Sequence, residues 1–177
     1  MITVRKATPD EFARVGELTV AAYRALAVDH LFGGYDKRIR DTETRAREAD
    51  VLVAVADGRV LGSVTYVGDS SSEWSEWTEP GEAQFRLLAV DPASHGQGAG
   101  AALVLACMER AAAAASTIVI HTTPWMKIAQ GMYERFGFVR RPDRDVQYEV
   151  WKDDEDVQLT DEWAGQAFLA YSWSATD

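Results

Sequence analysis

Hydrophobic and polar positions follow two different periods along the chain, and these periods predict a series of strands and helices. Runs of strand length occupy residues 2–6, 51–56, 60–67, 85–90, 118–120, 146–151 and 166–173. Helical spacing of apolar residues, or a run of strong helix formers, occupies residues 9–23, 101–115 and 125–135, and a more polar helix is predicted over residues 36–49. Strands that alternate with helices predict a mixed α/β sandwich.

Glycine marks two of the predicted breaks between these elements. Asp57-Gly58 is the dipeptide most typical of a tight β-hairpin, and it joins the second and third strands. Gly137 is predicted to end the helix at residues 125–135. The apolar face expected on that helix consists of Ile128, Met132 and Phe136.

The segment between the strand at residues 85–90 and the helix at residues 101–115 is rich in glycine. Its sequence is His95-Gly96-Gln97-Gly98-Ala99-Gly100. Glycines let the backbone approach a ligand closely, and the first turn of the following helix has unpaired amides and the positive end of the helix dipole. This combination predicts an anion site, most plausibly for phosphate.

Two common phosphate motifs fit this segment poorly. A P-loop requires Lys followed by Ser or Thr after its last glycine, whereas two alanines follow here. The spacing Gly96-x-Gly98-x-x-Ala101 matches a dinucleotide fingerprint superficially. However, five residues separate Val90 from Gly96, whereas that motif turns directly off its strand. The next strand also ends without an acid that could hold a ribose.

The segment instead resembles motif A of the GCN5-related N-acetyltransferase (GNAT) superfamily, Q/R-x-x-G-x-G/A after a strand and Val-x-Pro. The chain reads Val90-Asp91-Pro92 and then His95 to Gly100, with His95 where the family usually has Gln or Arg. A second segment, Ala129-x-x-Met132-Tyr133-Glu134-x-x-Gly137-Phe138, is similar to the family's A-x-x-L-Y-E-x-x-G-F. The two motifs stand in the family's order, and the resemblance extends loosely over almost the whole chain.

The resemblance implies an α/β fold with a central, mostly antiparallel sheet flanked by helices, and acetyl-CoA as the cosubstrate. By resemblance, the motif-A strand and its neighbour splay apart, Leu88 and Val90 bond the pantetheine arm, and the amide of one of them polarises the acetyl carbonyl. The amides of Gly96, Gly98, Ala99, Gly100 and Ala101 would hold the pyrophosphate. The full cofactor-binding set expected is Leu88, Ala89, Val90, His95, Gly96, Gln97, Gly98, Ala99, Gly100, Ala101, Ala129 and Tyr133.

The resemblance also implies an acetyltransferase that acts on a primary amine by direct attack in a ternary complex. Tyr133 matches the family's tyrosine that can protonate the leaving thiolate. His121 and Glu82 are rival candidates for the general base, and loss of the proton to solvent without either residue stays open. Met126 stands where the family often has an Asn that bonds pantetheine. Because of this difference and of His95, an acyl-CoA sensor without turnover is the alternative function.

Residues outside the two motifs could contact the acceptor. The long loop at residues 68–83 carries acids around two tryptophans, which could hold an ammonium group by charge and cation–π contacts, although such loops are usually only solvated. Those residues are Glu73, Glu76, Glu79, Glu82, Trp74 and Trp77. By resemblance of the first helical pair, Tyr23, Asp29, His30 and Tyr35 are further candidates, against core packing or plain surface exposure.

Composition and charge limit the remaining possibilities. A chain of 177 residues with 47% hydrophobic residues suits a single domain over residues 1–177. A net charge of −10 disfavours nonspecific nucleic-acid binding. The same charge suits a cationic acceptor such as a small amine, a peptide N-terminus or lysine. Alternatively, the acidic residues merely aid solubility. Apolar runs are too short for a membrane span and no signal peptide is evident, so we expect a cytoplasmic protein without a membrane partner.

The single cysteine, Cys107, lies within a predicted helix. It cannot form a disulfide inside the chain, and its expected distance from the cleft argues against an acyl-cysteine intermediate. We expect no metal cofactor, and whether the chain forms a homodimer stays open.

Overall fold

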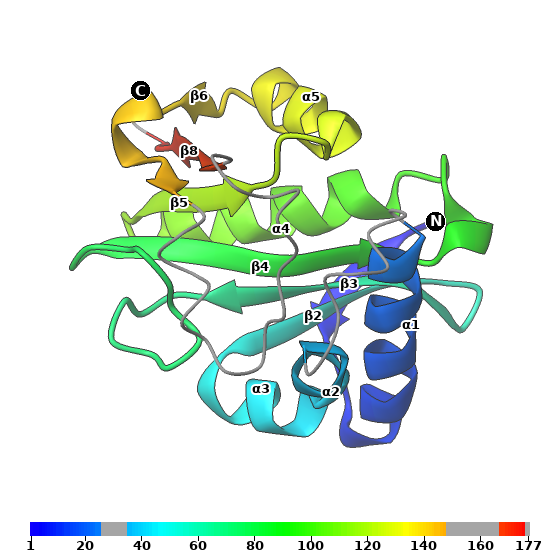
Figure 1. Ribbon diagram of the computed structural model, residues 1–177. Helices are drawn as coiled ribbons and strands as arrows, with labels where there is room; N and C mark the ends of the chain where they lie inside the picture. Colours follow the sequence, from blue (N-terminus) through cyan, green and yellow to red (C-terminus); the bar gives the residue numbers. More distant parts are fainter. Residues whose placement is uncertain (26–34, 148–166, 176–177) are drawn as a thin grey trace.

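The computed structural model describes residues 1–25, 35–147 and 167–175. In this part of the chain, eight strands form a sheet of order β1-β2-β3-β4-β5-β8-β6, and β7 also pairs with β8 (Figure 1). The strands are β1 (Thr3–Lys6), β2 (Asp50–Ala56), β3 (Arg59–Val67), β4 (Glu82–Val90), β5 (Thr117–Thr122), β6 (Val139–Arg140), β7 (Val146–Gln147) and β8 (Ala167–Trp173). Among the described strand pairs, only β4 and β5 run parallel. The predicted mixed, mostly antiparallel sheet is confirmed.

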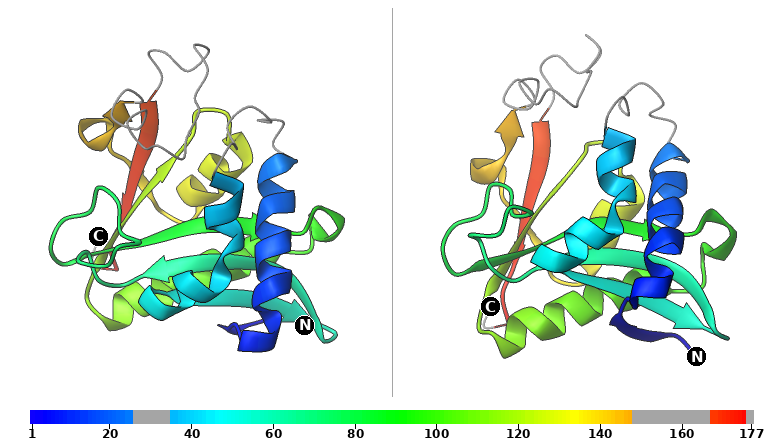
Figure 2. Two further views of the ribbon diagram at one scale, coloured as in Figure 1. Left: turned by 60° about the horizontal axis from the view of Figure 1, so that its bottom comes forward. Right: turned by 90° about the horizontal axis from the view of Figure 1, so that it is seen from below.

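Helices cover both faces of this sheet. They are α1 (Phe12–Arg24), α2 (Tyr35–Arg40), α3 (Thr42–Glu48), α4 (Ala99–Ala113) and α5 (Lys127–Arg135), with 3₁₀ turns at Pro9–Glu11, Pro92–Ser94 and Pro142–Arg144. Figures 1 and 2 show α1, α2 and α3 on one face and α4 on the other. Every helix in the described part of the chain is too short or too polar to traverse a lipid bilayer.

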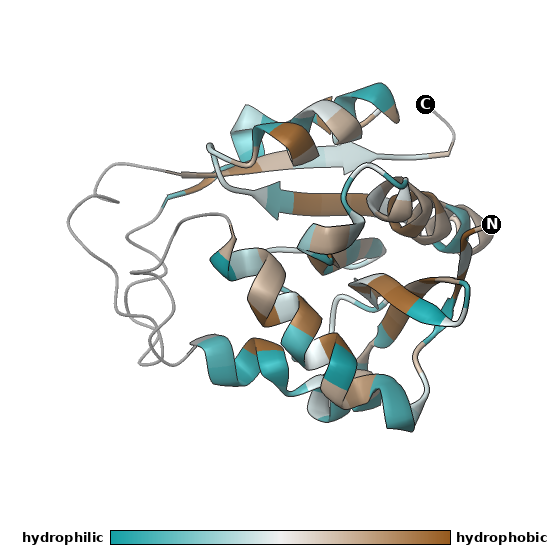
Figure 3. Ribbon diagram, turned by 90° about the vertical axis from the view of Figure 1, so that its right-hand side faces the viewer, coloured by the Kyte–Doolittle hydropathy of each residue, from teal (hydrophilic) through white to brown (hydrophobic). Residues whose placement is uncertain are grey.

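The main hydrophobic core lies between α4, α5 and the sheet. Its buried residues include Leu52, Val64, Phe85, Leu103 and Ile118. A smaller cluster on the α1 face contains Val20, Ile39, Val67, Trp74 and Leu87. In Figure 3 the strands carry much of the brown, apolar colour, whereas teal, polar residues gather on the outer surfaces of the helices.

The hairpin and helix-stop predictions from glycine are confirmed. Asp57 and Gly58 both have positive φ, 50° and 71°, as a tight type I′ hairpin requires. Gly137 follows α5 with φ 86°, and the amide of Phe138 donates to the carbonyl of Tyr133, which makes a Schellman end. The apolar face predicted for this helix is wrong at Ile128, which is 90% exposed.

The predicted helix at residues 36–49 is in fact two helices. Asp41 lies between α2 and α3, and its carboxylate accepts a hydrogen bond from the amide of Thr44 at 3.0 Å, so it caps the second helix. Other boundaries shift by a few residues. The strand predicted at residues 85–90 begins at Glu82, the two later helices begin at Ala99 and Lys127, and the strand predicted over residues 146–151 is described only for β7.

Candidate functional site

Strands β4 and β5 separate soon after they begin. They pair only at Glu82 with Thr117 and at Ala83 with Ile118, and the rest of β5 pairs with β8 on its other side. At the far end of β4, the amide of Asp91 donates to Leu61 of β3 at 2.8 Å. Because backbone groups of successive strand residues point to opposite sides, those of Val90 face the gap between β4 and β5. The expected splay is therefore present.

A bulge in β4 shapes this gap. Thr65 of β3 lies opposite Arg86 and Ser63 lies opposite Ala89, so Val64 alone faces both Leu87 and Leu88. Leu87 has φ 51°, a left-handed conformation that is rare for a residue with a branched side chain. As a result, Leu87 packs in the cluster on the α1 face, whereas Leu88 and Val90 pack against the core on the α4 face.

The glycine-rich segment forms an exposed turn at the start of α4. Gly96 and Gly98 have φ of 79° and 89°, which a glycine adopts without strain. In the described part of the chain, five amides of this turn have no hydrogen-bond acceptor: those of Gly96, Gly98, Ala99, Gly100 and Ala101. These are the amides expected to hold a pyrophosphate. The amides of His95 and Gln97, in contrast, donate at 3.5 and 3.4 Å within the turn.

Asp91, the acid that precedes this turn in the sequence, already has two partners. Asp91 accepts a hydrogen bond from the amide of Ala93 at 2.9 Å and pairs with Arg14. The backbone hydrogen bond and the Arg14 charge lower the pKa of this carboxyl. With its charge balanced by Arg14, Asp91 opposes a bound phosphate less than a free carboxylate would.

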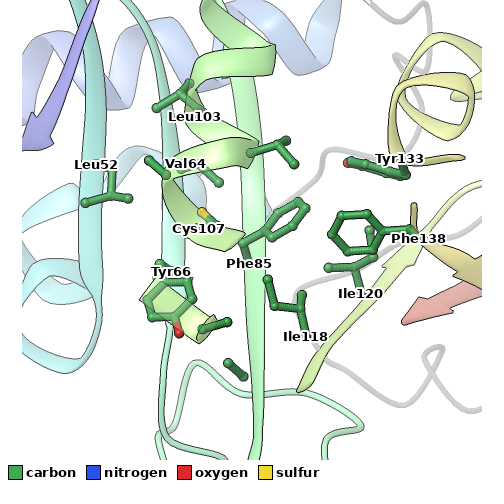
Figure 4. Close-up of a cluster of buried hydrophobic side chains, with 14 of the residues drawn as sticks. Leu52, Val64, Tyr66, Phe85, Leu103, Cys107, Ile118, Ile120, Tyr133 and Phe138 are labelled. Carbon is green, nitrogen blue, oxygen red and sulfur yellow. The ribbon is translucent and has the colours of Figure 1, made fainter. Parts of the chain in front are cut away.

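Tyr133 lies in the core on the α4 face of the sheet. It is 6% exposed, and its ring centroid lies 5.7 Å from both Phe85 and Phe138. Figure 4 shows its hydroxyl end directed toward α4. Burial raises the pKa of this hydroxyl, so it is protonated at neutral pH and could donate a proton. Ala129, one turn earlier on α5, packs against the same core.

His121 points to the opposite face of β5. Ile118 and Ile120 belong to the core around Tyr133, so alternation along the strand directs His121 away from it. Its Nε2 lies 3.1 Å from the carbonyl oxygen of Arg144, which can only accept, so Nε2 carries the proton and Nδ1 has the lone pair. Burial, and then the positive charge of Arg144, lower the pKa of His121 despite that hydrogen bond. The imidazole is therefore neutral at pH 7.

Glu82, the rival base, forms a bidentate ion pair. Its two carboxylate oxygens accept from the Arg144 guanidinium at 2.9 and 3.0 Å. Burial alone would raise the pKa of Glu82, but the hydrogen bonds from Arg144 and from the amide of Glu79 outweigh it and lower the pKa. A carboxylate held in this way is a weaker proton acceptor than the neutral imidazole of His121.

Several of the acids and tryptophans that could hold an ammonium group in the loop before β4 already contact other side chains. Trp74 is 6% exposed, packs in the α1-face core and has the guanidinium of Arg38 5.3 Å from its ring centroid. Glu76 pairs with Arg86 at 2.7 Å, and Glu82 pairs with Arg144. Trp77 is different, because its ring meets that of His121 at 5.0 Å and that of Phe168 at 5.4 Å.

The remaining candidates are placed only in part. Tyr23 packs against the α1-face core. Asp29 and His30 lie outside the described residues, as does the side chain of Tyr35. Cys107 is fully buried in α4, and burial raises the pKa of its thiol to about 12, so little thiolate forms at neutral pH. In the described ranges, no three His, Cys, Asp or Glu side chains are grouped so that they could hold a metal ion.

Arg144 is a residue of the candidate site that the sequence did not reveal. Its guanidinium holds Glu82 and also the carbonyl of Trp77 at 3.1 Å, while its own carbonyl orients His121. The only signal in the sequence was its position in a charged turn beside Pro142.

Comparison with known proteins gives a consistent result. The sequence profile described as the Acetyltransferase (GNAT) family matches residues 15–138. A GNAT family acetyltransferase from Brucella melitensis in complex with acetyl-CoA is 26% identical, with a TM-score of 0.59 over 78% of this chain and 83% of that protein. A comparison with curated protein sequences gives no significant match.

Two structures with lower sequence identity share the fold over nearly the whole chain. YncA from Salmonella typhimurium with its cofactor acetyl-CoA is 16% identical, with a TM-score of 0.68 over 98% of this chain and 93% of that protein. The PaiA N-acetyltransferase from Thermoplasma acidophilum in complex with coenzyme A is 13% identical, with a TM-score of 0.68 over 98% of this chain and 99% of that protein.

Proposed function

Because the chain belongs to the GNAT family of acetyltransferases, we propose that it transfers the acetyl group of acetyl-CoA to a primary amine of a small molecule or peptide. One observation carries the proposal: the gap between β4 and β5 leads to a turn with five free amides. A gap lined by backbone groups suits the amides of a pantetheine arm, and free amides at a helix N-terminus suit a pyrophosphate. Both parts of the coenzyme thus find partners along one path.

The proposal assigns the binding residues along this path. Leu88 and Val90 would bond the pantetheine through the backbone, and one of their amides would polarise the acetyl carbonyl. Gly96, Gly98, Ala99, Gly100 and Ala101 would hold the pyrophosphate. When bound, acetyl-CoA supplies the acetyl group as a thioester.

The proposed chemistry uses residues on opposite faces of β5. His121 Nδ1 takes one proton from the acceptor ammonium and later releases it to solvent. The amine nitrogen bonds to the acetyl carbonyl carbon, the carbon–sulfur bond breaks, and its electron pair leaves with sulfur. The hydroxyl of Tyr133 protonates that sulfur and regains a proton from the second N–H lost as the amide forms. Acid and base thus approach the gap from different sides.

A thiol-release assay with acetyl-CoA tests the proposal. The panel of acceptors contains polyamines, aminoglycosides, amino acids and peptides, and calorimetry with acetyl-CoA runs in parallel. We expect acetyl-CoA binding and thiol release with at least one amine. Tight binding with silence across the whole panel would favour the acyl-CoA sensor instead, and absence of binding would overturn the site assignment.

A further inference from the structure

Two buried polar atoms without hydrogen-bond partners lie two residues apart near the end of β5. They are Nδ1 of His121 and Oγ1 of Thr123. Buried polar atoms are almost always paired in folded proteins, so each unpaired atom requires an explanation. The rest of each residue is well held: His121 Nε2 meets the carbonyl of Arg144 at 3.1 Å, and the carbonyl of Thr123 accepts from the side chain of Gln130 at 2.8 Å.

The backbone places these two side chains on the same side of the chain. Thr123 precedes Pro124, and the residue before a proline is driven to an extended conformation, so the alternation of β5 continues through Thr123. Thr122 points the other way, because its hydroxyl donates to Met126 Sδ at the start of α5. His121 and Thr123 therefore share the face on which the ring of Trp77 contacts that of His121.

The chemistry of the two atoms defines what they can bind. Nδ1 of His121 is a hydrogen-bond acceptor, because Nε2 carries the proton, so its partner must donate. The hydroxyl of Thr123 can also accept. The Cα atoms of residues two apart in a strand are separated by about 6.6 Å. Two acceptors that each lie about 2.9 Å from one tetrahedral nitrogen are roughly 5 Å from each other. The side chains of His121 and Thr123 can bring their acceptor atoms to this spacing.

We propose that Thr123 Oγ1 and His121 Nδ1 together bind the nitrogen of the acceptor ammonium, so that Thr123 is a substrate-binding residue of this enzyme. The inference rests on the proposed function, because it places the acceptor beside the base. One N–H of a primary ammonium bonds to His121 and is the proton removed, and a second N–H bonds to Thr123. The neutral amine that remains stays held by Thr123 while it attacks.

Kinetics of matched variants test this subsite, with the primary amine of the panel that is acetylated fastest. Thr123→Val keeps the shape but removes the hydroxyl, and we expect it to raise the KM for the amine roughly ten- to a hundred-fold, as loss of a hydrogen bond to a charged group does. The acetyl-CoA Kd should stay within two-fold. Thr123→Ser should keep the amine KM close to that of the wild type. Thr122→Val should also leave it unchanged, because the hydroxyl of Thr122 lies on the other face and bonds to Met126.

A spectroscopic measurement tests the subsite without turnover. The protein is labelled with ¹⁵N-histidine, and the His121 signals are assigned by their loss in His121→Gln. At pH 8, propylammonium chloride should shift the Nδ1 resonance in the wild type and in Thr123→Ser. We expect at most a weak shift in Thr123→Val, and none with tetramethylammonium chloride, which has the same charge but no N–H.

The outcomes separate the two proposals. If Thr123→Val weakens acetyl-CoA binding and leaves the amine KM unchanged, the hydroxyl faces the coenzyme and the subsite is wrong. The subsite is also wrong if both ammonium salts shift the Nδ1 resonance equally. It is likewise wrong if propylammonium shifts this resonance equally in the wild type and in Thr123→Val. If the wild type acetylates no amine, the proposed function fails, and the resonance of His121 still decides whether the subsite exists.

Discussion

Replacing Gly98 by Glu should strongly weaken acetyl-CoA binding while the protein stays folded. Gly98 is exposed, has φ 89°, and a Cβ built on it meets no atom within 4 Å. A side chain at this position extends from the turn that carries the free amides, where the pyrophosphate would lie. Its carboxylate would replace an attraction between amides and phosphate by a repulsion between two anions.

The size of the effect follows from the backbone and from Coulomb's law. A residue with a Cβ in a left-handed conformation costs about 1–2 kcal/mol, which lowers the Tm of a chain of this length by about 2–8 °C. Two unit charges about 5 Å apart repel by about 1 kcal/mol in water and about 3 kcal/mol near a protein surface. Charge repulsion alone should therefore lower acetyl-CoA affinity about five- to a hundred-fold. The Glu side chain would also exclude the pyrophosphate from the turn sterically, which adds to this loss.

Gly81→Glu is the matched control. Gly81 has φ 87°, is exposed and is equally open, but it precedes β4, whereas Gly98 follows it. The nine residues of that strand separate the two sites by about 30 Å. Both variants should lose similar stability in thermal unfolding, and only Gly98→Glu should lose affinity in calorimetry. Unchanged affinity in Gly98→Glu, or an equal loss in Gly81→Glu, would refute the assignment of the phosphate turn.

Three further predictions concern the chemistry. Tyr133→Phe should lower kcat roughly 10²–10³-fold with little change in the acetyl-CoA Kd, because only the acidic hydroxyl is lost; an unchanged kcat would exclude Tyr133 as the acid. The rate should rise with pH through an inflection below about 6.5, because His121 must be neutral to accept a proton and its pKa is lowered. His121→Gln should remove that inflection, whereas Glu82→Gln should retain an inflection. If only Glu82→Gln gave a flat pH–rate profile, Glu82 and not His121 would be the general base. Cys107 should resist iodoacetamide at pH 8 until urea unfolds the protein, because its buried thiol has a pKa of about 12; rapid labelling of the folded chain would contradict this burial.

Features set by neighbouring residues could be predicted from the sequence. The hairpin at Asp57-Gly58 and the helix end at Gly137 depend on backbone conformations that few residue types favour, so composition reveals them. Asp41 carried a similar signal, since an Asp before a helical stretch is a common N-cap, but the arginine-rich pattern on both sides concealed it.

Features set by distant residues could not be predicted in this way. Glu82 looked like a base because it is an acid on the strand of motif A, yet its partner Arg144 is 62 residues away in sequence. The bulge at Leu87 depends on the register between β3 and β4, and leucine itself gives no sign of a positive φ. Ile128 was assigned to the core from helical spacing, but α5 turns this position to solvent.

The gap between β4 and β5 also affects how far proteins of this kind can diverge. The groups that Leu88 and Val90 would offer to the coenzyme in the proposed site are amides and carbonyls, and every residue except proline has both. A substitution at either position that keeps the strand and its bulge therefore leaves the same row of donors and acceptors. Recognition of this type imposes little selection on side-chain identity, so sequences can drift apart while the surface for the coenzyme persists. Similarity of backbone conformation should thus outlast similarity of sequence as a record of common ancestry.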